Sequence, residues 1–249
     1  LRWAAREPYG AQALVFALLL DGNEGIRQHQ LAHLETHLET GLGAETLRLW
    51  PSVLATAREF RLPLVDLSLP ALRQLSAPQA TTFRAALTTL IAADGRVRLF
   101  EWCLSRILLA GLEPDRGTGP TGSGAGGQAD CQHLARDCAL ILTLVARLHG
   151  GEGQEMACNQ AFSLGGERLG LPEATRMDGA PLDHERLDAS LRQLRRLKPQ
   201  AKRGLLEACA AIILLDANVS PAELEILRAI GAILDCPIPP LAIPTSSPA

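Results

Sequence analysis

Two acidic turns carry the carboxylates that are best placed to bind a ligand. In each copy an apolar helical run ends at an aspartate, and a glutamate follows seven residues later: Asp94 and Glu101, then Asp216 and Glu223. Ca²⁺ needs six to eight oxygen ligands, which an EF-hand loop supplies at fixed spacing. The first turn offers two carboxylates and two arginines. We therefore expect Asp94 to bond to turn amides and Gly95 to permit the backbone turn.

The helix after the second turn carries a complete capping motif. Ser220 lies at the N-cap, Pro221 at the first helical position and Glu223 three residues after the cap, which is the pattern of a capping box. This role explains Glu223 without a ligand, and Asp216 belongs to the turn. In the first copy the cap position holds Arg98, and arginine caps poorly, so local structure explains Glu101 less well.

A stripe of histidines offers another possible metal site. His29, His33 and His37 recur every four residues, so they share one helix face. Two imidazoles can hold a transition metal, but the spacing provides no third ligand. Glu35 follows His33 by two residues, about 200° around a helix, and so does not complete the H-E-x-x-H pattern of a zinc protease. We expect the histidines to face solvent.

A local concentration of positive charge is the next feature. It spans a helix end and the following turn, where it could contact anionic lipid or an acidic protein, or simply face water. Its residues are Arg192, Arg195, Arg196, Lys198, Lys202 and Arg203. The whole chain has a formal net charge of -3, without the basic excess typical of nucleic-acid binding. We expect no nucleic-acid partner.

The sequence contains no recognisable nucleophile motif. It has no G-x-S-x-G elbow, and the glycines at 122–127 follow no strand that would make them a phosphate-binding loop. Six cysteines include no C-x-x-C pair, and most lie in apolar helical runs, which favours a reducing cytosol. They are Cys103, Cys131, Cys138, Cys158, Cys209 and Cys236. We expect no catalytic residue and no cofactor in this chain.

The elements that position these residues are predicted to be helices. Strong helix formers and apolar residues at three- and four-residue spacing, without period-two runs, predict an all-α helical bundle in which two helix-turn-helix repeats pack together. Pro63 and Pro70 interrupt an apolar segment, and Ser76 begins the helix that ends at Ala93. Other helices are expected over 9–21, 24–40, 130–148 and 156–169, with Asp183 capping the helix that contains Leu187–Leu197.

Composition divides the chain into five parts. Glycine and proline dominate 113–129, which reads as a flexible linker, and proline recurs in the tail. The longest apolar stretch near the start has eight residues, at 13–20, against the roughly 20 that span a bilayer. The parts are an N-terminal helical segment at 1–60, a first half-repeat at 61–112, the linker at 113–129, a second half-repeat at 130–236 and the tail at 237–249.

The two turn-containing helix pairs are expected to bury apolar side chains. Exposure of these side chains would contradict the paired-repeat interpretation. They are Ile91, Val97, Leu99, Trp102, Leu108, Ile213, Val219, Leu224, Leu227 and Ile230.

Four stretches resemble a known family. They are Pro8–Asp21, Leu62–Leu72, Ala93–Trp102 and the segment from Leu205 through Asp235–Pro240. They look like the C-terminal region of bacterial HtpX-type membrane zinc metalloproteases, described as proteases with chaperone function. The repeats also resemble the TerB-type helical module, in which an Ala-Asp-Gly turn and a downstream glutamate recur. The second copy departs from that pattern at Ala217 and Asn218.

The resemblance implies a longer parent protein. Its H-E-x-x-H helix, zinc and membrane helices would precede Leu1, and this chain would lie on the cytoplasmic side, tethered to the inner membrane. The expected function is a non-catalytic accessory or interaction domain of that metalloendopeptidase, contacting the protease domain or other proteins. The alternative is a stand-alone TerB-like stress-response module that binds metal or a protein partner through Asp94, Glu101, Asp216 and Glu223. Substrate, partner and oligomeric state stay open.

Overall fold

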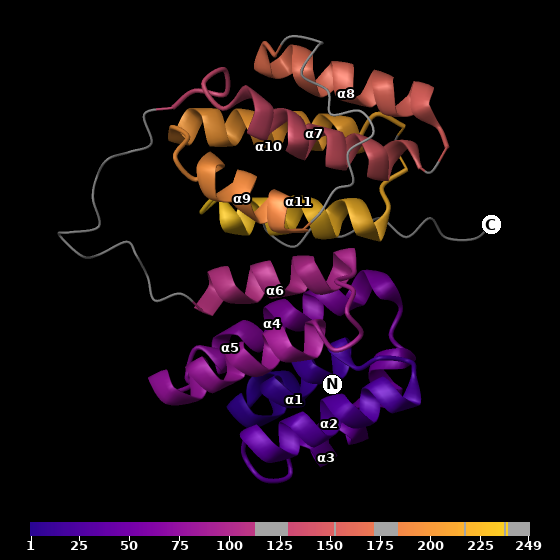
Figure 1. Ribbon diagram of the computed structural model, residues 1–249, viewed down its shortest axis with the longest axis vertical. Helices are drawn as coiled ribbons and strands as arrows, with labels where there is room; N and C mark the ends of the chain where they lie inside the picture. Colours follow the sequence, from indigo (N-terminus) through magenta and orange to yellow (C-terminus); the bar gives the residue numbers. More distant parts are fainter. Residues whose placement is uncertain (113–128, 152, 172–183, 217, 237, 239–249) are drawn as a thin grey trace, which may run out of the picture. The chain divides into compact units, whose positions relative to one another are not determined.

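The computed structural model describes residues 1–112, 129–151, 153–171, 184–216, 218–236 and 238. Those residues form eleven α-helices and two short 3₁₀ helices, with no strand, so the all-α prediction is confirmed. The chain divides into two compact units, Leu1–Pro114 and Asp115–Ala249, which Figure 1 colours from indigo to magenta and from red to yellow. The predictions for 113–128, Asp183, Ala217, Pro237 and 239–249 lie outside the described residues.

The first unit is built around α1 (Pro8–Leu19), whose residues from Gly10 to Leu19 are all buried. Helices α3, α4 and α5 and the 3₁₀ helix η1 pack against it, α2 packs on α3 and α5, and α6 packs on α4 and α5. Their bounds are η1 Ala4–Arg6, α2 Glu24–His37, α3 Leu42–Leu54, η2 Arg58–Phe60, α4 Arg61–Leu72, α5 Ala77–Ile91 and α6 Leu99–Leu112.

The second unit has a corresponding central helix, α7 (Ala135–Gly150), with an unbroken buried run from Cys138 to Ala146. Helices α8, α9, α10 and α11 all pack against α7, and α8 also packs against α10. Their bounds are α8 Glu155–Leu169, α9 His184–Leu194, α10 Pro199–Ile213 and α11 Pro221–Ile233. In each unit, therefore, a central helix with a long buried run contacts most of the other helices.

Three helix predictions need correction. The helix expected over 24–40 ends at His37, and a separate helix, α3, begins after Gly41. Gly41 adopts a φ of 85°, a conformation that glycine tolerates best, so the chain turns there. Pro63 and Pro70 lie within α4 instead of interrupting it. Proline fits at 63 because first-turn N–H groups have no intrahelical acceptor.

The third correction concerns the helix expected over 130–148. It starts only at Ala135, because residues 131–134 form turns. The ten apolar positions expected to be buried are all at least partly covered. Trp102, Leu108, Ile213, Leu227 and Ile230 are buried, and the other five are intermediate.

The close packing of Gly10 against Ala4 leads to a prediction about stability. A Cβ on this α1 glycine would lie 2.6 Å from the Ala4 carbonyl oxygen and 2.9 Å from Ala4 Cα. Both atoms are backbone, so Gly10→Ala must displace η1. We expect a loss of about 2 kcal/mol in the free energy of unfolding, measured by urea denaturation with tryptophan fluorescence. Gly25→Ala in α2 is the control, because its nearest neighbour would lie 3.4 Å away.

An equal loss in the two glycine variants would contradict this explanation. The control variant is expected to gain up to about 1 kcal/mol, because alanine favours the helix more than glycine does.

Candidate functional site

The first acidic turn joins α5 to α6. The Asp94 Oδ1 atom accepts a hydrogen bond of 2.9 Å from the Arg96 backbone N–H, and Gly95 has a φ of 70°. A side-chain bond two residues onward is an Asx-turn, which closes the loop locally. The structure therefore gives Asp94 and Gly95 turn-forming contacts that need no metal.

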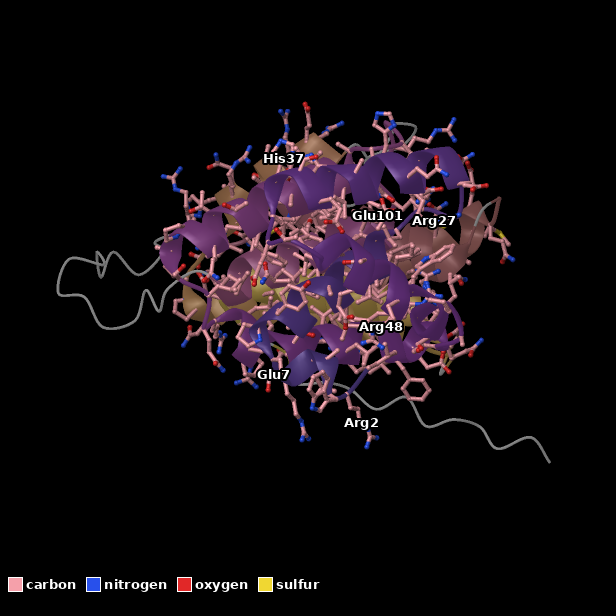
Figure 2. The ribbon with its side chains drawn as sticks, turned by 90° about the horizontal axis from the view of Figure 1, so that it is seen from below. Arg2, Glu7, Arg27, His37, Arg48 and Glu101 are labelled. Atoms are coloured by element: carbon pink, nitrogen blue, oxygen red, sulfur yellow. The ribbon has the colours of Figure 1, made fainter. Side chains whose placement is uncertain are left out.

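One guanidinium group gathers the carboxylates around this turn. Arg98 Nη2 lies 2.9 Å from Asp21 Oδ2 and 3.0 Å from Asp94 Oδ2, and Arg98 Nη1 lies 2.8 Å from Glu101 Oε1. The Arg98 backbone N–H also donates to Glu101 Oε2 at 2.9 Å. Figure 2 labels Glu101 among the helices of the first unit, whereas Arg2 projects away from them. We call Asp21, Asp94, Arg98 and Glu101 the Arg98 cluster.

The Arg98 cluster corrects the sequence-based view of Glu101. Its carboxylate satisfies the N–H of the cap residue, as the glutamate of a capping box does. The Arg98 guanidinium donates to the same carboxylate, but it has no acceptor for a helix N–H, unlike the hydroxyl of a serine cap. The structure thus explains Glu101 by its bonds to the backbone and side chain of Arg98, while arginine remains a poor N-cap residue, as the sequence predicts.

The opposite charges in the Arg98 cluster shift the pKa values of Arg98 and Asp21. The pKa of Arg98 is raised from its ordinary value, first by its hydrogen bond to Asp21 and next by that to Glu101. The pKa of Asp21 is lowered, first by a hydrogen bond from the Asn23 backbone N–H and also by Arg98. Three carboxylates and one guanidinium leave the cluster with a net negative charge.

Asp21 is brought to the cluster by a buried glutamine. The Gln30 side chain accepts from the Asp21 N–H at 2.9 Å and donates to the carbonyls of Leu19 and Leu90, each at 3.0 Å. It thereby ties the end of α1 to the end of α5. Arg27 closes the same corner by donating to the Asp21 carbonyl at 3.0 Å. Buried polar groups must be paired in this way to avoid a desolvation cost.

The second acidic turn joins α10 to α11 and repeats the local bonds. Asp216 Oδ1 accepts from the Asn218 N–H at 2.9 Å. The Ser220 N–H donates to Glu223 Oε2 at 2.7 Å, and Ser220 Oγ accepts from the Glu223 N–H at 3.3 Å. Pro221 occupies the first helical position. The turn and cap contacts expected from the sequence are all present.

Glu223 has a second partner that the sequence did not indicate. Its Oε1 atom lies 3.0 Å from Nδ1 of His149, and the two side chains are only 3% and 6% exposed. His149 lies in the last turn of the central helix α7, and Asp21 follows the end of the central helix α1. In each unit, therefore, the end of the central helix reaches the capping group after the acidic turn. Both partners are far away in sequence, so spacing gave no signal.

The histidine stripe lies on α2. His29 and His37 are exposed and His33 is half-buried, and the rings of His33 and His37 stack with centroids 4.3 Å apart. The pKa of His33 is lowered, first by burial and then by His37. Glu35 instead caps α3, accepting from the Ala44 N–H at 2.9 Å. Glu35 therefore has a different role from the histidines, because its carboxylate bonds to the start of α3.

The basic stretch is partly bonded within the second unit. Lys198 lies 3.1 Å from Asp130, and Arg203 lies 2.7 Å from Glu207. Lys202 donates to the Leu234 carbonyl at 3.0 Å, and Arg195 lies 3.5 Å from an Asp235 oxygen. Arg192 and Arg196 are exposed. Contact of this stretch with an anionic membrane surface stays a prediction.

The carboxylates of both acidic turns bond to backbone N–H groups and side chains of their own unit. Among the described residues, no group of three or more His, Cys, Asp or Glu side chains is arranged to hold a metal ion. A cation entering the Arg98 cluster would have to displace a guanidinium that already bonds three carboxylates.

In the part of the chain that the structure describes, no helix has the length and apolar character to cross a membrane.

Comparison of the chain with protein-family models, with curated proteins and with solved structures finds no match.

Asp21 provides a pH-dependent prediction. Its pKa in the folded protein lies below the ordinary value of 3.8, so its contribution to stability is present above that value and is lost as pH falls through the folded pKa. We expect the stability difference between the wild type and Asp21→Asn to shrink as the pH falls below about 4. Urea denaturation at each pH measures it. A difference that stays constant down to the lowest pH would contradict the assigned charge interaction.

Proposed function

We propose that this chain is a non-catalytic accessory and interaction domain of a membrane-anchored zinc metalloendopeptidase. It would lie on the cytoplasmic side, held at the inner membrane by the parent protein, whose own domain would carry the zinc and the catalytic residues. The resemblance to HtpX-type proteases supports the parent. The observation that carries the non-catalytic role is the use of the acidic groups: Arg98 bonds three carboxylates, and Glu223 divides its oxygens between Ser220 and His149.

Exposed apolar side chains of the first unit support an interaction role. Trp3 is 73% exposed and Phe60 is 54% exposed, and aromatic residues are enriched in protein interfaces. Trp3 precedes η1 and Phe60 ends η2, and both of these elements pack on α4. The other large exposed apolar side chains described in this unit are Leu47, Leu54 and Leu67.

Site-specific photocrosslinking in the source cell tests this proposal. A photoreactive residue at Phe60 is expected to give a cross-linked peptide pair in which the second peptide comes from the metalloprotease domain. The matched control is Thr81, an exposed polar position on α5, which is expected to give little adduct. Cross-links from Phe60 that join it only to peptides outside the protease domain, in cells that make the parent, would contradict the proposed contact. The intact mass of the native product and an H-E-x-x-H helix within it test the parent itself.

The alternative proposal is a stand-alone TerB-like stress module that binds metal. The net negative charge of the Arg98 cluster favours it. Metal-free protein titrated with Ca²⁺, Mg²⁺ and Zn²⁺ in a calorimeter distinguishes the two. The accessory-domain proposal expects no heat and no shift in melting temperature, whereas a metal module would show both and would lose them in Asp94→Asn and Glu101→Gln.

A further inference from the structure

Two histidine rings lie face to face at the end of α2. His33 and His37 are about one helical turn apart. Their ring centroids are separated by 4.3 Å, and the planes of the rings differ by 24°. Residues four apart project from the same side of a helix, and here the two side chains are in direct contact. The pair therefore presents two imidazole groups at one place on the surface of the first unit.

A hydrogen bond fixes the tautomer of His37. Its Nδ1 atom lies 3.1 Å from the backbone carbonyl oxygen of His33. A carbonyl oxygen can only accept, so Nδ1 carries the proton and the neutral ring has its lone pair on Nε2. Metal-binding histidines are commonly held in this way, with one ring nitrogen donating to a carbonyl and the other on the metal. His37 is exposed, so its Nε2 atom is available as a ligand.

His33 is kept unprotonated by its surroundings. Its pKa is lowered from the ordinary value of 6.5, first by burial and then by His37, so the ring is mostly neutral at pH 7. A metal ion then has no proton to displace from it. Helix α2 also contains two glutamates and one arginine, so its formal charges do not oppose the approach of a cation.

The buried side of α2 holds the pair in position. Leu34 is fully buried and Gln30 is 4% exposed. The Gln30 amide donates to the carbonyls of Leu19 and Leu90, each at 3.0 Å, which fixes this part of α2 against α1 and α5. Ligands carried by a rigid helix lose little conformational freedom when an ion binds.

We propose that His33 and His37 form a two-histidine site for a divalent transition-metal ion that favours imidazole in a tetragonal or square-planar arrangement, such as Ni²⁺ or Cu²⁺. Metal–nitrogen bonds of about 2.1 Å at two adjacent positions place the nitrogen atoms about 3 Å apart. Rings whose centroids are 4.3 Å apart reach that separation by rotation of the side chains, without movement of the helix backbone. Water completes the coordination of the ion.

This site is separate from the acidic turns. It uses two nitrogen ligands of α2, whereas Asp94 and Glu101 offer oxygen ligands that Arg98 already bonds. Structural Zn²⁺ sites take four protein ligands, so two histidines serve Zn²⁺ poorly, and an ion that keeps several waters fits better. Because α2 ends at His37, the bound ion would connect the last two turns of the helix and raise the stability of the folded first unit.

Calorimetric titration of the untagged full chain with NiCl₂ at about pH 7.5 tests the proposal. Ni²⁺ is the probe because, unlike Cu²⁺, it does not oxidise cysteine thiols. We expect one ion to bind per chain and the melting temperature to rise with the Ni²⁺ concentration. Both effects are expected to disappear at about pH 5, where the imidazoles are protonated and no longer bind the ion.

Three variants locate the ion. His33→Ala and His37→Ala are each expected to abolish the heat and the melting shift. His29→Ala is the matched control, one turn earlier on the same stripe, and is expected to change neither. Circular dichroism checks that each variant is folded.

The proposal is overturned if the wild type binds no Ni²⁺, if the heat survives in His33→Ala and His37→Ala, or if His29→Ala removes it as well. Loss of the heat in Asp94→Asn but not in His37→Ala would overturn it too, because the ion would then lie at the acidic turn.

Discussion

Replacing Arg98 by alanine is expected to lower the free energy of unfolding by about 2–3 kcal/mol. The variant leaves Asp21, Asp94 and Glu101 without the cation that all three contact, and their side chains are only about a tenth exposed. Losing one partner of a fully buried ion pair costs roughly 3–5 kcal/mol. The Arg98 side chain is itself 57% exposed, so water replaces part of its effect and the lower value applies.

Tryptophan fluorescence during urea denaturation measures this loss of stability in the first unit. All three tryptophans lie in the first unit, at Trp3, Trp50 and Trp102. Arg48→Ala is the matched control, because Arg48 also pairs with a glutamate one turn away but on the surface, where such pairs contribute little. Adding Asp21→Asn to Arg98→Ala is expected to recover part of the stability. Equal behaviour of the Arg48 and Arg98 variants would show that the cluster does not hold the turn.

Replacing Glu223 by alanine is expected to have a comparable or larger effect, a loss of about 3 kcal/mol. Glu223 is 2% exposed, and its two oxygens serve the Ser220 N–H and the His149 ring. The variant removes a helix cap and leaves a buried imidazole nitrogen without its carboxylate. Hydrogen exchange should then quicken in 199–233, the region of α10 and α11.

A double-mutant cycle isolates the His149–Glu223 contact. The interaction free energy between His149→Ala and Glu223→Ala is expected to exceed about 1 kcal/mol, because the two side chains share a buried bond. Glu207→Ala is the control, since Glu207 meets Arg203 at the exposed surface of α10, and it should leave exchange unchanged. Strict additivity in the cycle would mean that the observed 3.0 Å contact carries no stabilisation.

Local sequence patterns predicted most helices and caps well, because helix formation and capping depend on neighbouring residues. The capping box at Ser220 and Glu223 follows from three-residue spacing and is present in the structure. Helix α3 was missed because Pro51 and the glycines around its start obscure the helical pattern. Pro63 was predicted to interrupt the segment, although a proline in the first turn removes no intrahelical hydrogen bond.

The partners of the acidic turns could not be predicted from sequence. Asp21 lies 77 residues before Arg98, and His149 lies 74 residues before Glu223. Such contacts depend on how the central helix passes the turn, which no periodicity encodes.

The bond from Gln30 to Leu90 has a consequence for synthesis of the protein on the ribosome. The Gln30 amide spans 60 residues of sequence, so it lacks one of its acceptors until α5 has left the exit tunnel. Helices α1 and α2 can form earlier. The turn between them, however, stays hydrated and accessible to proteases until α5 has been synthesised. Slowing translation between residues 30 and 90 should therefore expose the nascent chain to cleavage near Asp21, and completing α5 should end that vulnerable period.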